Sequence, residues 1–262
     1  MHPILFHIGS FEMASYGLMM ALAYLIPTWY LYRRLNYIKL DKDTFFNIIF
    51  IAFISALIGS KLLYIIVSWP EMGSTLSEKL FTALRTFRYG FVFFGGAIVA
   101  ICTLLYYLKK KKLPVLKIAD FYIVALPLGH AVGRIGCFLA GCCHGRPTDM
   151  PWGVVFNDPH TLVAPQYIGV PLHPTQLYEV GLNLILFFIL QHFYKKQHRD
   201  GTILTMYVIG YACLRFFIEF FRGDFRGGFL LGMSPSQCIA LATAAIAAIA
   251  LYYLKKDTSH AH

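Results

Sequence analysis

The sequence predicts an all-α integral membrane protein with seven transmembrane helices in one polytopic domain, residues 1–262, and three observations favour this fold class. First, 58% of the residues are hydrophobic and 14% are charged, a composition too apolar for a soluble domain of this length. Second, the chain contains apolar runs of about 20 residues, the length that crosses a ~30 Å hydrocarbon core. Third, basic residues cluster directly after several of these runs, as in membrane proteins.

The expected spans follow one another along the whole chain. Their approximate bounds are residues 15–32, 44–69, 90–108, 118–140, 175–194, 202–221 and 235–254. The first residues lack the basic segment and the small-residue cleavage site of a signal peptide. We therefore expect the first apolar run to remain in the protein as a span.

The distribution of Lys and Arg predicts the orientation of these spans. Between the spans, 14 of these residues fall on one side and 6 on the other. Because cytoplasmic loops carry an excess of Lys and Arg, we expect the N-terminus outside and the C-terminus in the cytoplasm. The same topology accounts for the net charge of +10, so we expect no nucleic-acid partner.

Ionisable residues from four of the spans fall at a similar depth. At a rise of 1.5 Å per residue, the basic residues inside spans and the acidic residues near them lie in the outer third of the bilayer. They are Lys61, Arg134, Glu179, Arg215 and Glu219, with Tyr178 beside them. Ionisable residues inside a membrane usually face a bundle interior and pair there. The pattern therefore predicts a shared polar cavity near the outer leaflet.

Two arginines near the outer face, Arg134 and Arg222, are candidates for binding a phosphate group. A guanidinium offers forked donors that match a phosphate, and an anionic phospholipid places its phosphate at this depth. The alternative is an arginine that snorkels at a helix end, and it is favoured for Arg222 taken alone. Glu219 lies on one helix face with Arg215 and Arg222, where it orients the site or simply balances their charge.

Polar residues and glycines at other outer helix ends are further candidates. His173 and Tyr178 lie where the fifth span begins and suit proton transfer or hydrogen bonding to a lipid headgroup. A lone tyrosine at an interface is ordinarily an anchor. Gly95 and Gly96 begin the third span, where exposed backbone N–H groups bind phosphate or, more often, small residues allow close helix packing.

A cysteine-rich segment, with Cys137, Cys142, Cys143 and His144, lies at the end of the fourth span and directly after it. Its spacing matches no standard zinc pattern, and no second Cys/His pair completes a set of four ligands. A strained disulfide between the vicinal cysteines is an alternative, but buried structural thiols are the commoner case. We therefore expect no bound metal and no cofactor.

Three motifs together resemble a known family. GRIGCFLAGCCHGR covers residues 133–146, HPTQLYE covers 173–179 and RFFIEFFRGD covers 215–224. In order and spacing they are similar to signatures of the prolipoprotein diacylglyceryl transferase family. The resemblance extends over essentially the whole chain, and the seven spans and the outer N-terminus agree with it.

The resemblance implies a multi-pass enzyme of the bacterial plasma (inner) membrane with its active site near the outer leaflet. It implies transfer of the diacylglyceryl group of phosphatidylglycerol to the lipobox cysteine thiol of a prolipoprotein signal peptide, with release of glycerol phosphate. With the candidates above, the catalytic set is Arg134, Arg222, Tyr178 and His173. The substrate-binding set is Gly95, Gly96, Glu179, Glu219, Arg146, Cys137 and His144.

Two departures from the family pattern affect this site. Cys137, Ala140 and Cys142 stand where family members usually have Asn, Asn and Glu, so polar groups are lost or replaced by thiols. Phe94 stands where the family has a histidine, a candidate base for activating the acceptor thiol. The thiolate, and not the thiol, is the nucleophile. Phenylalanine takes up no proton, so the acceptor thiol has to lose its proton in another way.

Several alternatives remain open at this point. Another histidine is the base, or electropositive surroundings alone deprotonate the acceptor thiol; the candidate histidines are His130, His144 and His173. Alternatively, the chain is a divergent paralogue with a different thiol acceptor, or it binds phospholipid without catalysis. A last alternative is a thiol-redox or metal-handling membrane protein that uses Cys137, Cys142, Cys143 and His144.

Overall fold

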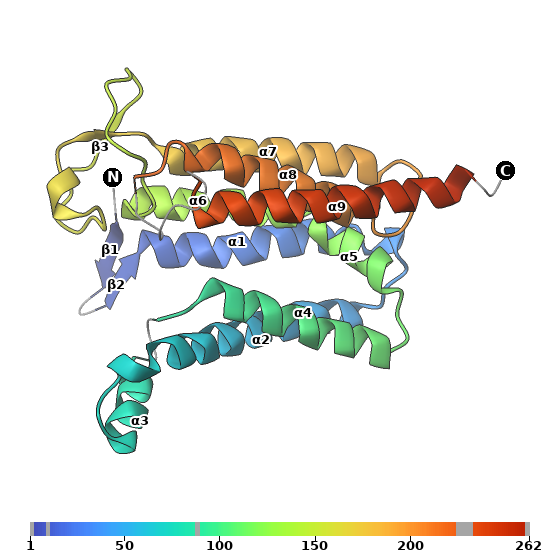
Figure 1. Ribbon diagram of the computed structural model, residues 1–262, viewed down its shortest axis with the longest axis horizontal. Helices are drawn as coiled ribbons and strands as arrows, with labels where there is room; N and C mark the ends of the chain where they lie inside the picture. The colour runs from blue at the N-terminus through green and yellow to red at the C-terminus, as the bar shows by residue number, and fades with distance from the viewer. Residues whose placement is uncertain (1–2, 9–10, 87–89, 224–232, 260–262) are drawn as a thin grey trace. The chain divides into compact units, whose positions relative to one another are not determined.

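The computed structural model describes residues 3–8, 11–86, 90–223 and 233–259 (Figure 1). The chain divides into two compact units, and each is described by itself. One unit comprises Met1–Arg34 with Ala119–His262, and the other comprises Leu35–Ile118.

The larger unit contains a β-hairpin followed by long helices. Strands β1 (Ile4–Ile8) and β2 (Phe11–Ala14) pair antiparallel and lead directly into the first helix. The helices are α1 (Ser15–Tyr32), α6 (Leu126–Ala140), α7 (Thr175–Tyr194), α8 (Thr202–Glu219) and α9 (Pro235–Ser259). In this order each helix packs against the next, so that α6, α7 and α8 are consecutive neighbours (Figure 1).

The span expected over residues 118–140 is broken into two helices, α5 (Val115–Ile123) and α6. Two turn residues separate them, and Pro127 lies in the first turn of α6. Proline has no backbone N–H and suits a helix start, so a new helix begins here more readily than the old one continues.

A buried carboxylate ties α5 to the start of α8. Asp120 is 1% exposed and accepts hydrogen bonds from the backbone N–H groups of Gly201 and Leu204, each at 2.7 Å. Its Oδ2 also lies 3.8 Å from Nε2 of His198. The first N–H groups of a helix have no partner within the helix, and Asp120 satisfies two such donors at the N-terminus of α8.

The connection between α6 and α7 has its own small fold. It contains strands β3 (Val154–Val155) and β4 (Pro171–Leu172), which pair antiparallel, and a 3₁₀ turn, η3 (Pro165–Tyr167). Its buried apolar cluster is formed by Phe156, Val163 and Leu172. The expectation of an all-helical protein is thus confirmed for the apolar spans, whereas this connection and the N-terminus carry short strands.

The smaller unit pairs two long helices, α2 (Lys42–Ser68) and α4 (Phe93–Lys110). They correspond to the spans expected at 44–69 and 90–108, with ends shifted by a few residues. Short 3₁₀ turns, η1 (Leu35–Tyr37) and η2 (Trp69–Glu71), lie at the two ends of α2.

Glycines allow α2 and α4 to approach closely. Gly59 on α2 faces Gly95 on α4, and a Cβ atom on either residue would collide with the carbonyl oxygen of the other. A Cβ atom on Gly96 would lie 2.7 Å from the carbonyl oxygen of Ala56. Close helix packing, one of the two roles expected for Gly95 and Gly96, therefore explains why these residues are small.

A third helix in the smaller unit, α3 (Leu76–Arg85), was not anticipated from the sequence. It begins with a capping box: Thr75 Oγ1 accepts from the N–H of Glu78 at 3.3 Å, and Glu78 Oε2 accepts from the N–H of Thr75 at 3.2 Å. This reciprocal pair satisfies two N-terminal donors. The Thr-x-x-Glu spacing was the available signal for it.

Six helices in the described part of the chain are long and apolar enough to cross a membrane. They cover Lys42–Glu71, Phe93–Lys110, Val115–Ala140, Thr175–Tyr194, Thr202–Glu219 and Pro235–Tyr252. Helix α1 falls outside this group because its tyrosines, Trp29 and Pro27 lower its hydropathy. The protein is therefore a multi-pass membrane protein built mainly of helices.

Candidate active site

Three charged side chains meet where α6, α7 and α8 come together. Glu179, in the first turns of α7, is 1% exposed. Its Oε2 lies 2.7 Å from Nε of Arg134 on α6, and its Oε1 accepts from Nη1 of Arg222, just after α8, at 3.3 Å. One carboxylate thus holds two arginines from two other chain segments in the same place.

The two arginines differ in exposure. The side chain of Arg222 is 1% exposed, whereas that of Arg134 is 21% exposed. Arg134 contacts Glu179 through Nε, and within the described residues no hydrogen bond or ion pair occupies its two terminal nitrogens. Because a guanidinium binds a phosphate best through a pair of N–H donors, the outer edge of Arg134 is the part of the cluster suited to a ligand.

Backbone hydrogen bonds join the three chain segments that carry this cluster. The N–H of Gly145 donates to the carbonyl of His173 at 2.8 Å, and the N–H of His173 donates to the carbonyl of Arg146 at 3.0 Å. The N–H of Arg146 donates to the carbonyl of Phe221 at 2.9 Å. These bonds fix the segments after α6, before α7 and after α8 to one another.

Gly145 is required at the centre of this junction. A Cβ atom there would lie 2.5 Å from Cβ of His173 and 2.6 Å from the carbonyl oxygen of Phe221. Real Cβ contacts are longer than this, so any side chain would push the segments apart. Arg146, the next residue, contributes its backbone to the junction while its side chain is exposed.

A hydrogen-bonded chain of aromatic side chains lies beside the charged cluster. Nε1 of Trp152 donates to the hydroxyl of Tyr178 at 2.7 Å, and the same hydroxyl lies 3.1 Å from Nδ1 of His173. Burial and the positive charge of Arg146 lower the pKa of His173 below its ordinary value of 6.5, so its ring is neutral at pH 7. Because Trp152 already donates to the Tyr178 oxygen, Tyr178 can donate to Nδ1, and this arrangement puts the ring proton of His173 on Nε2.

Glu219 pairs with one arginine rather than two. Its Oε2 accepts from Nη2 of Arg215 at 2.7 Å, one turn earlier on α8, and the same nitrogen lies 3.3 Å from the hydroxyl of Ser236 on α9. Arg222 is directed to Glu179 instead. Two roles were expected for Glu219: orienting the site, or balancing the charge of neighbouring arginines. Within the described residues, its contacts fit charge balance.

The cysteines singled out from the sequence also lie together. The Sγ atoms of Cys137, Cys142 and Cys143 are all within 4.8 Å of one another, and the three thiols are not joined by a disulfide. His144 is separate from them: its Nδ1 donates to the carbonyl of Gly145 at 2.8 Å, and its ring packs against aromatic side chains of the α6–α7 connection.

The remaining site candidates have contacts of their own. The N–H groups of Gly95 and Gly96 both donate to the carbonyl of Val92, at 3.1 and 3.4 Å, so these donors are already used within the smaller unit. Lys61 belongs to the same unit, where it donates to the carbonyl of Thr86 at 2.6 Å. His130 lies one turn before the Arg134 position on α6 and packs against the ring of Tyr211.

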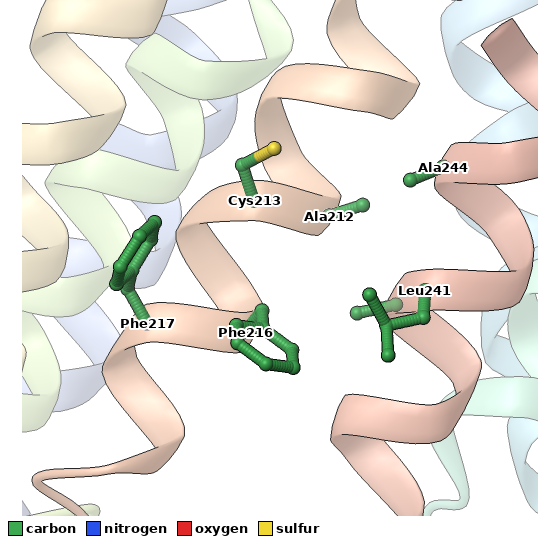
Figure 2. Close-up of a pocket in the computed structure, with 7 residues that line it drawn as sticks. Ala212, Cys213, Phe216, Phe217, Leu241 and Ala244 are labelled. Atoms are coloured by element: carbon green, nitrogen blue, oxygen red, sulfur yellow. The ribbon is translucent and has the colours of Figure 1, made fainter.

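An apolar hollow lies between α8 and α9 (Figure 2). Phe216, Phe217 and Cys213 project from α8, and Leu241 and Ala244 lie on α9. Apart from one thiol, its lining has no group that can donate or accept a proton. It therefore carries none of the chemistry of the charged cluster.

The chain is similar to known proteins over nearly its whole length. The family model for prolipoprotein diacylglyceryl transferase matches residues 3–253. The chain belongs to the prolipoprotein diacylglyceryl transferase family. The phosphatidylglycerol-prolipoprotein diacylglyceryl transferase of Clostridium tetani is 37% identical over 244 residues, covering 93% of this chain and 94% of the relative. Transferase 2 of Clostridium perfringens is 35% identical over 261 residues, covering 98% and 96%.

Membership of the diacylglyceryl transferase family decides between the functional alternatives. The match extends over nearly the whole chain, including the segments that carry Arg134, Glu179 and Arg222. Relatives of this similarity are named as transferases. This favours an enzyme over a non-catalytic lipid-binding protein or a thiol-redox protein.

Sequence reasoning missed three residues that hydrogen-bond within the candidate site. Trp152 was overlooked because it lies in the long α6–α7 connection, where sequence gives no indication of a partner. Thr175 and Gln176 stand inside the HPTQLYE motif and bind the carbonyls of Cys143 and Cys142, at 2.9 and 2.8 Å. Two polar residues in the first turn of an apolar helix, next to a histidine, were the signal that could have identified them.

Proposed function

We propose that this protein moves the diacylglyceryl group of phosphatidylglycerol to the lipobox cysteine thiol of prolipoprotein signal peptides and releases glycerol phosphate. The relatives named above are phosphatidylglycerol-prolipoprotein diacylglyceryl transferases. The observation that carries the proposal is the partly exposed Arg134, held through Nε by Glu179 with its terminal nitrogens left for an anion.

In this proposal Arg134 binds the lipid phosphate directly, and Arg222 acts from behind it. Arg222 is buried against Glu179, so its role is to keep the site positively charged rather than to meet the lipid. Glu179 fixes both guanidinium groups and takes up part of their charge. A net positive charge remains where the phosphate of the leaving group gains negative charge, which is where preorganised donors lower a barrier most.

The transfer itself exchanges one bond for another. The acceptor thiolate attacks the glyceryl carbon, a C–S bond forms, and the C–O bond to the phosphate breaks. The electron pair leaves with the oxygen of glycerol phosphate, and the thiol proton passes to solvent. We assign the ring proton of His173 to Nε2, with Tyr178 donating to Nδ1. In this tautomer Nε2 of His173 donates a hydrogen bond to the headgroup.

We propose further that α1 is a seventh span, with the N-terminus outside and the site near the outer leaflet of the bacterial plasma membrane. Helix α1 has 18 residues, which at 1.5 Å per residue is about 27 Å, close to the ~30 Å of a hydrocarbon core. The excess of Lys and Arg on the opposite side supports this orientation. A fluorescent protein that folds only in the cytoplasm, fused after residue 262, should be bright.

The test of the reaction is transfer of radiolabelled glyceryl lipid from phosphatidylglycerol to a lipobox peptide by the purified protein in detergent. Arg134→Ala should lower transfer by about 10²- to 10³-fold, the usual cost of removing a donor from a charge-stabilising site. Its thermal midpoint should stay close to that of the unmodified protein. Arg34→Ala, at the opposite end of the neighbouring helix, is the matched control and should transfer normally.

Two results would contradict the proposal. Folded protein that transfers no label in the presence of phosphatidylglycerol would reject the reaction. Transfer by Arg134→Ala at the unmodified rate would keep the reaction and reject Arg134 as the phosphate ligand.

A further inference from the structure

The thiols of Cys137, Cys142 and Cys143 form a cluster that the transfer chemistry above does not use. Their Sγ atoms lie within 4.8 Å of one another, at the end of α6 and in the turn that follows it. A zinc ion bound at about 2.3 Å to each sulfur brings tetrahedral sulfur ligands to about 3.8 Å from one another. Small side-chain rotations therefore convert the observed arrangement into a metal site.

The backbone brings these side chains together without help from an ion. Gly141 ends α6 with φ +82°, and Cys143 has φ +59°, a left-handed conformation that few residues other than glycine adopt. Two such residues in close succession turn the chain back, so that Cys142 and Cys143 return to Cys137. A linear C-x4-C-C spacing does not reveal this, which is why the sequence argued against a metal site.

Buried side chains of α7 hold that turn in place. The hydroxyl of Thr175 donates to the carbonyl of Cys143 at 2.9 Å, and Nε2 of Gln176 donates to the carbonyl of Cys142 at 2.8 Å. Thr175 and Gln176 are both fully buried. Metal sites need such supporting hydrogen bonds to orient their ligands, and here they are already formed.

The charges around the cluster suit a divalent ion. Arg134 and Arg222 with Glu179 leave one net positive charge, and three thiolates with one divalent ion leave one net negative charge.

Three sulfur ligands leave a fourth position open. His144 does not fill it, because its Nδ1 binds the carbonyl of Gly145 and its ring is held among aromatic side chains. Structural zinc sites are closed by four protein ligands, whereas catalytic sites keep one position for water or substrate. The substrate that brings a sulfur atom to this enzyme is the acceptor cysteine.

We propose that Cys137, Cys142 and Cys143 bind one zinc ion whose fourth position takes the acceptor thiol as a thiolate. This rests on the proposed function. A thiol that coordinates zinc gives up its proton to solvent, so the metal supplies the nucleophile that Phe94 and His173 do not. The bound thiolate then attacks the glyceryl carbon, forming the C–S bond as the C–O bond to phosphate breaks.

Metal binding is tested first, on the full-length reduced protein in detergent. Titration with Cd²⁺, a spectroscopic substitute for Zn²⁺, should give a thiolate-to-metal charge-transfer band that saturates at about one ion per chain. Zn²⁺ should bind competitively and protect the three thiols from maleimide. Cys142→Ser should lose the band, and Cys213→Ser, which changes a cysteine in the apolar hollow between α8 and α9, should keep it.

The binding experiment can overturn the metal site in two ways. Absence of the band and of thiol protection in the unmodified folded protein rejects the site. A disulfide among the three cysteines in protein purified without reductant rejects it as well. Because the unmodified protein is measured directly, a folding failure of Cys142→Ser does not decide the outcome; Cys137→Ser is the second variant.

The transfer assay then tests the role of the open position. Removing the metal with a chelator should lower transfer by at least about tenfold, and Zn²⁺ should restore it. Transfer that is insensitive to removal of a bound ion rejects the activating role. Transfer without any metal binding rejects the site and leaves the proposed function standing, whereas metal binding without transfer rejects the proposed function and leaves the site standing.

Discussion

Two buried carboxylates, Glu179 and Asp120, have nearly equal exposure and very different surroundings. Each residue is 1% exposed. Asp120 accepts from two backbone N–H groups at the start of α8, which are fixed by the helix itself. Glu179 accepts from the side chains of Arg134 and Arg222, which come from two other segments. Burial alone therefore does not distinguish a structural carboxylate from one in a candidate active site.

The two carboxylates differ in how many hydrogen bonds their partners can still donate to another group. The N–H groups bound by Asp120 have no further capacity, so this interaction can only hold α5 to α8. Arg134 is bound by Glu179 through Nε, and a guanidinium has more donors than this one contact uses. A carboxylate that orients such a side chain leaves donors for a second anion, and this is the physical reason for proposing a phosphate at Arg134.

The largest effect should come from removing Glu179. Glu179→Ala removes the carboxylate that is paired with the buried Arg222, and breaking a buried ion pair from one side costs about 3–5 kcal/mol. We expect a large fall in the thermal midpoint and loss of transfer. Adding Arg222→Met should recover much of the stability and none of the transfer. A double variant that recovers transfer would show that Glu179 acts only through stability.

A smaller effect is expected at Asp120. Asp120→Asn keeps one acceptor oxygen but loses a hydrogen bond to a charged group, which is worth about 1.5–3 kcal/mol. The thermal midpoint in detergent should fall, and transfer per folded molecule should not change. Reduced transfer by fully folded Asp120→Asn protein would remove the contrast between the two carboxylates.

The smallest effect concerns pH and His173. The folded chain protonates His173 only at a lower pH than the unfolded chain does, because burial and Arg146 lower its pKa. Protons then favour the unfolded state, so the stability of the protein should fall as the pH drops through about 6.5. Glutamine does not titrate. Between pH 7.5 and pH 5.5 the thermal midpoint of His173→Gln should therefore fall less than that of the unmodified protein, by on the order of a few degrees. Equal slopes would contradict the lowered pKa.

Depth along the helices predicted part of the charged cluster. Arg134 and Glu179 are far apart in the sequence and were predicted at one level, and the structure pairs them. Lys61 was predicted at the same depth but belongs to the smaller unit, where it binds Thr86. Pairing was harder to predict than location. Glu219 stands three residues before Arg222 on the chain, yet it binds Arg215, because Arg222 lies beyond the end of α8 and turns toward α7.

Local signals that compete with hydrophobicity explain most of the differences between the predicted and the observed fold. Apolar runs predicted the spans, but they hid the break before Pro127, where a missing N–H matters more than apolar character. The thiol cluster was out of reach for another reason. It depends on the left-handed conformation of Cys143, a non-glycine residue, and sequence does not indicate such conformations.

The backbone junction of Gly145, His173 and Phe221 has a consequence for biosynthesis. The chain enters the membrane from its N-terminus, and α6 and α7 are complete well before Phe221 and Arg222 are synthesised. Until α8 is in place, the N–H of Arg146 has no carbonyl to bind and Glu179 has only one arginine. A partly inserted chain is therefore surrounded by its lipid substrate while it still lacks the site to act on it.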